Sequence, residues 1–293
     1  MDVFRTPDER FEGLPGFDFE PQYTEVDGLR LHYVDEGTGA PIICFHGEPT
    51  WAYLYRKMVP PLKEAGYRVI CPDYAGFGRS DKPTDRDWYS YDRHSELMSK
   101  LLEGLDLTDA TVVVQDWGGA IGLRWAVENS ERVGALVIMN TGVFSGRVSK
   151  GFLAWRDFAA KNPDLPVGFV IQGATTTELP DDVVAAYEAP FPNAESKAGA
   201  AAFPLLVPTS EEDATAVHQR EVVADGLSRW EKPALLAFSD EDPVFPFPKT
   251  GDRFIDLIPS ASEQVRIEGA AHFLQEDRGE QIAAEMLRFL SAS

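Results

Sequence analysis

The chain has 293 residues, of which 44% are hydrophobic, a length that suits one large α/β domain with an insertion. Its 48 acidic and 27 basic side chains give a net charge of −21, which excludes nucleic acid and anionic membranes as expected partners, because both require a basic surface. This charge favours solubility, and adaptation to high salt is an alternative that composition leaves open.

The first ten residues are mostly charged and contain no apolar segment of the kind found in a signal peptide. No run elsewhere is long and apolar enough to cross a bilayer. The two cysteines, Cys44 and Cys71, fall in predicted strands, and we interpret them as buried thiols rather than as a disulfide. We therefore expect a cytoplasmic protein.

Short apolar runs alternate with helical stretches over the first 140 residues. This alternation is typical of a mostly parallel sheet that is covered by helices on both faces. The predicted strands are Leu29–Val34, Pro41–Phe45, Tyr67–Cys71, Thr111–Val114 and Val133–Asn140. The predicted helices are Trp51–Ala65, Tyr91–Leu105 and a helix from Trp117 to about Asn129.

From Thr141 to Gly226 the alternation stops, and the chain becomes rich in Ala, Phe and Pro without a convincing strand. We interpret this segment as a helical lid over the carboxyl ends of the strands. The predicted elements after it are a strand at Pro233–Phe238, a helix at Thr250–Leu257, a strand at Gln264–Ile267 and a final helix at Gly279–Leu290. The expected organisation is a core domain of residues 1–142 and 227–293, with a cap domain of residues 143–226 inserted after the sixth strand.

The most informative motif follows the strand Thr111–Val114, where Gln115 and Asp116 precede Trp117 and two glycines. A strand, a sharp turn and a helix form the nucleophile elbow of many hydrolases, which usually carry serine at its tip. A carboxylate there can displace a leaving group from a saturated carbon and form an ester that water later hydrolyses. The alternative is that Asp116 only caps the following helix.

A nucleophile of this kind needs a base and a residue that orients the base. His272 lies in a loop of small residues after the last predicted strand, whereas His46, at a strand end, is more typical of a residue that braces a turn. The orienting acid should follow the preceding strand, and Asp240, Glu241 and Asp242 are all found there. We choose Asp242, because Pro243 stiffens the turn that directs it.

The remaining candidates are hydrogen-bond donors. Backbone N–H groups of Glu48 and Trp117 are candidates for an oxyanion hole, and the dipole of the helix that begins at Trp117 also favours negative charge there. An indole N–H is a donor on a rigid apolar body, so Trp117 and Trp155 could hold a departing anion. The alternative for Trp155 is packing within the lid.

Five segments together resemble haloalkane dehalogenases of the α/β-hydrolase fold, in the subfamily with an Asp acid and two halide-binding tryptophans. The resemblance covers nearly the whole chain, and its most specific parts are Glu48–Trp51 and the Asp116-Trp117 pair. The segments are His46–Trp51, Tyr55–Met58, Gly76–Pro83, Gln115–Gly119 and His272–Glu276.

The resemblance implies an Asp116 nucleophile, a His272 base and an Asp242 acid. It further implies halide binding by Trp117 and Trp155, with oxyanion N–H groups from Glu48 and Trp117. A small apolar substrate pocket would be lined by Phe152, Phe203, Pro204, Val207, Val244 and Phe245. The family acid usually follows a Gly-x-x pattern, from which Ser239-Asp240-Glu241-Asp242 departs.

The implied activity is hydrolytic dehalogenation of small haloalkanes to an alcohol, halide and a proton, by a monomer without a metal or an organic cofactor. The first alternative is an epoxide hydrolase, which shares the Asp–His–acid core but needs phenolic donors from the lid. The lid offers one tyrosine, Tyr187. The second alternative is a non-catalytic ligand receptor on the same fold, which a complete set of catalytic residues disfavours.

Overall fold

The computed structural model describes residues 2–261 and 263–292. Its centre is an eight-stranded sheet with the order β10-β9-β8-β7-β4-β5-β3-β2, in which only β3 runs antiparallel to its neighbours. The strands are β2 (Gln22–Val26), β3 (Leu29–Glu36), β4 (Pro41–Phe45), β5 (Arg68–Pro72), β7 (Ala110–Gln115), β8 (Val133–Met139), β9 (Ala234–Ser239) and β10 (Gln264–Ile267). The mostly parallel sheet predicted from the sequence is confirmed, whereas β2 was not predicted. A second, two-stranded sheet pairs β1 (Val3–Phe4) with β6 (Lys82–Pro83).

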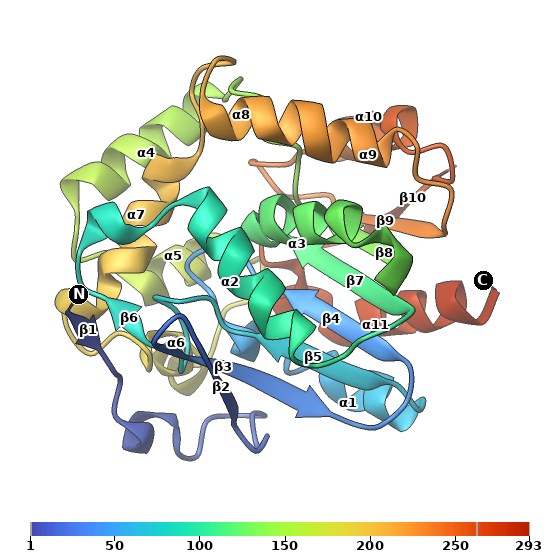
Figure 1. Cartoon of the computed structure of the whole chain (residues 1–293). Coiled ribbons are helices and arrows are strands. Elements are labelled where there is room, and N and C mark those ends of the chain that lie inside the picture. Colours follow the sequence, from blue (N-terminus) through green and yellow to red (C-terminus); the bar gives the residue numbers. More distant parts are fainter. Residues whose placement is uncertain (1, 262, 293) are drawn as a thin grey trace.

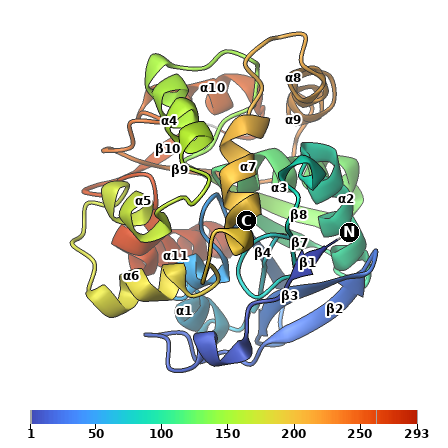
Figure 2. The same ribbon diagram turned by 90° about the vertical axis from the view of Figure 1, so that its left-hand side faces the viewer.

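Helices cover both faces of the central sheet, with α2 and α3 on one face and α1 and α11 on the other (Figure 1, Figure 2). The α-helices of the core are α1 (Val59–Glu64), α2 (Tyr91–Glu103), α3 (Trp117–Glu128), α10 (Lys249–Leu257) and α11 (Leu274–Ala292). The short 3₁₀ helices are η1 (Asp8–Phe11), η2 (Ala52–Tyr55), η3 (Arg86–Trp88) and η4 (Ser130–Arg132).

The chain between β8 and β9 forms helices and, within the described residues, no strand, as the sequence predicts. In Figure 2 these helices lie over one end of the core. They are α4 (Lys150–Lys161), α5 (Val167–Gly173), α6 (Asp181–Glu188), η5 (Glu195–Lys197), α7 (Ala198–Leu206), α8 (Ala214–His218), the π-helix η6 (Gln219–Ala224) and α9 (Asp225–Leu227). The division into domains at residues 143 and 226 stays a prediction.

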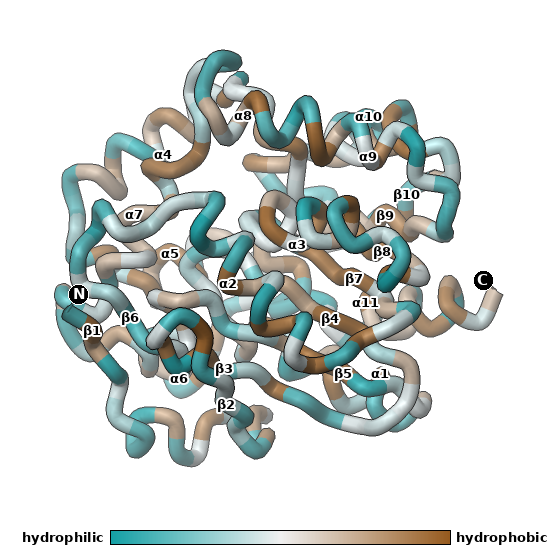
Figure 3. Tube along the Cα trace, viewed as in Figure 1, coloured by the Kyte–Doolittle hydropathy of each residue, from teal (hydrophilic) through white to brown (hydrophobic). Residues whose placement is uncertain are grey.

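The centre of the sheet is apolar because its middle strands are covered on both faces. All six residues of β7 are buried, and Val112, Val113 and Val114 have no exposed surface. Burying one such side chain stabilises the fold by about 1.5–3 kcal/mol. Figure 3 shows hydrophobic residues concentrated along β4, β7 and β8 and hydrophilic ones on the outer helices. This rigid centre holds the strand ends from which the candidate site is built.

Two predicted helices have different bounds in the structure. The helix expected over Trp51–Ala65 is instead a 3₁₀ turn followed by α1, because Pro60 and Pro61 lack the N–H groups that a continuous helix would need and fit the first turn of a new one. The last helix starts at Leu274 rather than Gly279, with a break at Arg278 (φ −141°, ψ 35°).

Both cysteines are buried free thiols, as expected. Across the described residues, no helix combines the length and the apolar character that crossing a membrane requires.

Candidate active site

Asp116 occupies the sharp turn between β7 and α3. Its backbone adopts φ 52° and ψ −123°, a positive φ that is uncommon for a residue other than glycine. Asp116 N donates to Asn140 O over 3.0 Å, and Thr141 Oγ1 donates to Asp116 O over 2.7 Å. Space also constrains the turn, since a Cβ on Gly118 would lie 2.2 Å from Phe45 O. The packing of three strand ends therefore holds Asp116 in this conformation.

The Asp116 carboxylate is directed into a cavity rather than back onto its own helix. It makes no capping bond to α3, and Oδ1 instead accepts the Glu48 N–H over 2.9 Å. Gly47 leaves room for this approach, because a Cβ there would lie 2.6 Å from Asp116 Oδ1. The side chain of Asp116 therefore does not serve as the N-cap of α3.

His272 lies between two carboxylates that come from the ends of different strands. Its Nδ1 is 2.9 Å from Asp242 Oδ2, and its Nε2 is 3.6 Å from Asp116 Oδ2. Burial opposes a positive charge on the imidazole, but Asp242 and Asp116 outweigh it and raise the pKa of His272 to about 10. The ring of Phe245 stacks on the imidazole with centroids 5.9 Å apart. The two carboxyl groups thus favour the protonated form of the imidazole between them.

The neighbouring acidic residues have other environments. Asp240 Oδ2 accepts from Arg266 Nη2 over 2.8 Å, and its Oδ1 accepts the Gly269 N–H over 2.9 Å. Glu241 is exposed. Of the three carboxylates after β9, only Asp242 contacts His272 in the described structure.

Glu48 is a buried acid beside the Asp116 carboxylate. Burial, followed by the charge of Asp116, raises the pKa of the Glu48 carboxyl well above its usual value. Within the described residues its Oε1 has no hydrogen-bond partner. The surroundings of Glu48 therefore favour its protonated form, and its backbone N–H is the group that contacts Asp116.

A cavity of about 900 Å³ opens from Asp116 between the core and the cap. Trp117 and Trp155 both line it, and within the described part of the chain neither indole N–H donates to another protein group. Five of the six predicted pocket residues also line it, namely Phe152, Pro204, Val207, Val244 and Phe245.

Phe203, the sixth predicted pocket residue, does not line the cavity. Its ring packs against that of Trp117, with centroids 4.8 Å apart, and against that of Phe77 at 4.7 Å. The reason is its place on α7, where Phe203 faces the core while the adjacent Pro204 faces the cavity. Phe203 thus contributes to the site indirectly, by packing against Trp117.

Two buried amides beside His272 were not predicted. Asn140 Nδ2 donates to the carbonyl oxygens of Ala271 (2.9 Å) and His272 (3.1 Å). Gln115 Nε2 donates to His272 O over 3.1 Å and lies 3.4 Å from His272 Nε2. Both residues stand at the ends of predicted parallel strands, and that position is the signal that could have identified them.

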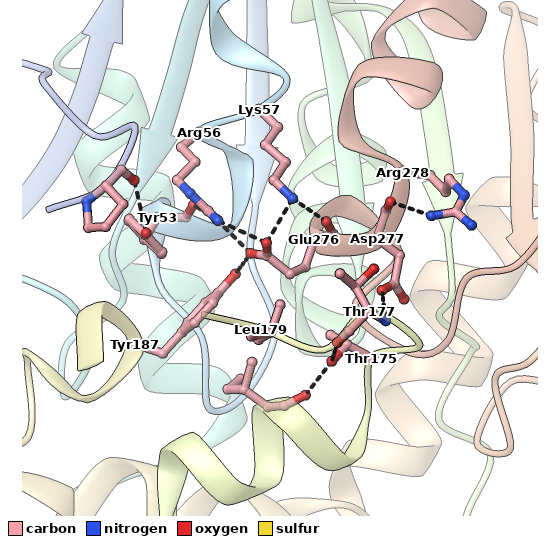
Figure 4. A network of polar contacts seen from close by, with 12 residues as sticks. Tyr53, Arg56, Lys57, Thr175, Thr177, Leu179, Tyr187, Glu276, Asp277 and Arg278 are labelled. Atoms are coloured by element: carbon pink, nitrogen blue, oxygen red, sulfur yellow. Dashed lines mark hydrogen bonds and ion pairs between the residues drawn. The ribbon is translucent and has the colours of Figure 1, made fainter. Parts of the chain in front are cut away.

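A second polar network ties the cap to the core (Figure 4). Glu276, in the first turn of α11, accepts two hydrogen bonds from Arg56 over 2.6 and 2.8 Å, and its Oε1 lies 2.9 Å from Lys57 Nζ. Tyr187 OH, from the cap helix α6, donates to Glu276 Oε2 over 2.6 Å. Burial opposes ionisation of Glu276, yet these partners, led by Arg56, hold its pKa below the usual value.

The adjacent Asp277 connects the cap to the histidine loop. Its carboxylate accepts the backbone N–H groups of Thr177 over 2.8 Å and of Ala271 over 2.9 Å. Phe273 N also donates to Ala174 O over 3.1 Å. The loop that carries His272 is therefore fixed from the sheet and from the cap.

Comparison with known proteins identifies relatives of the whole chain. A family model described as alpha/beta hydrolase fold matches residues 40–279. Haloalkane dehalogenase 1 of Mycobacterium bovis is 47% identical over 304 residues, with 100% of both chains covered. The haloalkane dehalogenase of Psychrobacter cryohalolentis is 44% identical over 302 residues, covering 99% of this chain and 98% of its own. The tetrameric haloalkane dehalogenase DpaA from Paraglaciecola agarilytica superposes with a TM-score of 0.93 at 34% identity over 97% of each chain. The fold predicted from the sequence is confirmed.

Proposed function

Since this chain belongs to the haloalkane dehalogenase family of the α/β-hydrolase fold, we propose that it hydrolyses small haloalkanes to an alcohol, halide and a proton through an ester on Asp116. The observation that carries the mechanism is the position of His272, whose two ring nitrogens face Asp242 and Asp116.

In the first step, Asp116 attacks the halogen-bearing carbon, a carbon–oxygen bond forms, and the carbon–halogen bond breaks with its electrons going to the halide. The indole N–H groups of Trp117 and Trp155 donate to the departing ion. Each hydrogen bond to a charged group contributes about 1.5–3 kcal/mol. Both donors are free of protein acceptors in the described structure, which supports this assignment.

Ester formation also converts His272 into a base. The Asp116 charge is one cause of the raised pKa of His272, and alkylation removes that charge. The pKa of His272 therefore falls, and the imidazolium releases the proton that appears as product. Neutral His272 Nε2 can then accept a proton from water.

In the second step, water attacks the carbonyl carbon of the ester while His272 takes one of its protons. Asp242 stabilises the imidazolium that forms. Backbone N–H groups of Glu48 and Trp117 stabilise the negative oxygen of the tetrahedral intermediate. Collapse releases the alcohol and restores the Asp116 carboxylate beside a protonated His272.

An epoxide hydrolase is the alternative with the same core, and it needs a phenol directed at the substrate. Tyr187 is fully buried, donates to Glu276 and does not line the cavity. Among the described residues that line the cavity there is no tyrosine. This arrangement favours dehalogenation over epoxide opening.

The His272→Phe variant tests the covalent mechanism. Alkylation should proceed and hydrolysis should stop, because the nucleophile remains while water activation is lost. Mass spectrometry after incubation with a bromoalkane should show one added alkyl group on Asp116, and Asp116→Ala should show none. Bromide release from the His272→Phe variant without an added mass would exclude the ester.

The same trapping assay tests the halide donors. Adding Trp155→Phe to the His272→Phe background should slow alkylation about tenfold or more, since a charge-assisted donor is lost. Adding Leu153→Ala, a change at an exposed residue of α4 outside the cavity lining, serves as the matched control and should leave the rate unchanged. Equal rates for the two combined variants would place the second donor elsewhere.

The monomeric state expected from the sequence stays a proposal. The net charge of −21 opposes association of two copies. The relative from Paraglaciecola agarilytica is tetrameric, so light scattering on this chain would decide between the two states.

A further inference from the structure

The cavity that leads to Asp116 is lined by slightly more basic than acidic residues, in contrast to the chain as a whole. Acidic side chains outnumber basic ones by 48 to 27 overall. The cavity nevertheless has four basic lining residues, Arg147, Arg220, Lys249 and Arg253. The sequence motifs and the proposed chemistry assign no role to any of them.

Two of these cations are already paired. Arg147 forms an ion pair with Glu211, and Arg220 lies 3.1 Å from Glu221. Lys249 and Arg253 differ, because neither has a carboxylate within ion-pair distance among the described residues. They are one helical turn apart on α10, both exposed, and both border the cavity. The cavity lining thus has two cations without an ion-pair partner among the described residues, since Asp252 and Asp256 of the same helix are exposed and form no ion pair with them.

Apolar residues connect these charges to the catalytic centre. Phe245 stacks on His272, and Val244 and Pro246 line the same cavity on the way to α10. A volume of about 900 Å³ lies at the upper end of the range for drug-sized ligands. A halogenated carbon alone needs far less room. The cavity therefore has room for a molecule larger than the halogenated carbon alone, with apolar groups next to the catalytic centre.

We propose that the preferred substrates are haloalkanoates, with the halogen on the terminal carbon of an aliphatic chain and a carboxylate at the other end. The halogenated carbon lies at Asp116 and the carboxylate at Lys249 and Arg253. This inference rests on the proposed dehalogenation and names its substrate class. The two cations offset locally the repulsion that a chain of charge −21 exerts on an anion.

The test compares terminally brominated bromohexanoate with bromohexanol, which has the same length and no charge. At low ionic strength the wild-type kcat/KM for bromohexanoate should exceed that for bromohexanol about tenfold, as expected for two exposed ion pairs. Raising the ionic strength with sodium acetate to about 0.5 M should remove most of the difference, because screening acts on exposed charges.

Charge-reversal variants test whether Lys249 and Arg253 bind the carboxylate of the substrate. In the Lys249→Glu/Arg253→Glu variant the ratio of the two kcat/KM values should fall below one, and in Lys249→Ala/Arg253→Ala it should fall to about one. Lys161→Glu, an exposed lysine of α4 outside the cavity lining, is the matched control and should keep the wild-type ratio.

The remaining outcomes would contradict either the proposed substrate class or the proposed function. A wild-type ratio near one, or a ratio that survives charge reversal, excludes the carboxylate-binding end while dehalogenation stands. A changed inhibition by bromide with an unchanged substrate ratio would assign the two cations to the product ion and overturn the substrate class. Failure to hydrolyse both compounds would overturn the proposed function itself.

Discussion

Asp240 and Asp242 are two residues apart and have opposite environments. Asp242 has no exposed side-chain surface, and its Oδ1 accepts the Val244 N–H over 2.7 Å while Oδ2 faces His272. Asp240 is bound to Arg266 and to the Gly269 N–H on the outer side of the turn. The proposed mechanism assigns to Asp242 the orientation of His272, whereas Asp240 holds the loop after β10.

We therefore expect Asp242→Asn to slow ester hydrolysis by orders of magnitude, because the amide neither stabilises the imidazolium nor enforces the tautomer. Alkyl-enzyme should accumulate during turnover and be visible by mass spectrometry. Asp240→Asn is the matched control and should hydrolyse the ester at close to the wild-type rate. Exchange of these two results would assign the acid to Asp240.

The raised pKa of Glu48 predicts how the free energy of unfolding changes with pH. Its folded pKa lies above the ordinary value of 4.5, so between these two pKa values the folded state holds a proton that the unfolded state has lost. The contribution of Glu48 to the free energy of unfolding is therefore largest below pH 4.5. It declines as the pH rises towards the pKa of Glu48 in the folded state.

Glu48→Gln removes this proton linkage while keeping a polar side chain of similar shape. The variant should melt at a higher temperature than wild type at pH 7, with about 2–4 °C gained for each kcal/mol, and the gain should vanish near pH 4. Differential scanning calorimetry across this range measures the difference. Glu25→Gln changes an exposed glutamate and should give no such trend. A gain that is independent of pH would contradict the assignment.

At the residue scale, the predicted residues that the structure brings together are those that follow a strong local pattern, while their catalytic roles stay a proposal. Asp116 follows a buried, valine-rich strand, and His272 follows the last strand. Asn140 and Gln115 escaped prediction because their role depends on which carbonyl oxygens meet them after the sheet has formed. The position of Phe203 depended in the same way on helix rotation, which residue type does not determine.

At the element scale, α11 is joined to the cap through its first turn. The Glu276 side chain is 1% exposed and that of Arg56 5%, so their ion pair lies out of solvent. Tyr187 adds a bond from α6 and Lys57 one from the segment before α1. Three separate elements therefore depend on one carboxylate.

Glu276→Gln should destabilise the protein by about 3 kcal/mol, because it leaves the buried Arg56 without a counter-charge. This loss corresponds to a melting temperature lower by roughly 10 °C. Glu280→Gln, on the exposed side of the same helix, is the matched control and should stay within about 0.5 kcal/mol of wild type. Equal denaturant midpoints for the two variants would show that the network contributes nothing to stability.

Element types were predicted better than element bounds. The buried parallel strands were found because each is a continuous apolar run, as in β7 and β8. The edge strand β2 was missed, since its sequence, Gln-Tyr-Thr-Glu-Val, is largely polar and only one of its residues is buried. The start of α11 was placed late, because Gln275, Glu276 and Asp277 have the polar side chains of surface residues although all three are buried.

On the scale of the whole molecule, the net charge of −21 places many like charges within one compact chain. The Debye length falls from about 30 Å at 0.01 M salt to about 8 Å at 0.15 M, so screening acts mainly over this range. Local ion pairs such as Arg68–Asp35 shield only a part of the charge. The remaining repulsion destabilises the folded state relative to the expanded chain.

The melting temperature should therefore rise by several degrees between about 0.01 and 0.15 M sodium acetate and then flatten, because screening saturates as the Debye length shrinks below the spacing of surface charges. Acetate is used because a halide salt would also bind the proposed site and stabilise the protein by mass action. A general salt effect on apolar burial would instead keep growing towards molar concentration. A melting temperature that does not change up to about 0.15 M salt would mean that the acidic surface serves solubility alone. A steep rise at low salt would instead indicate that repulsion between the acidic side chains substantially lowers the free energy of unfolding.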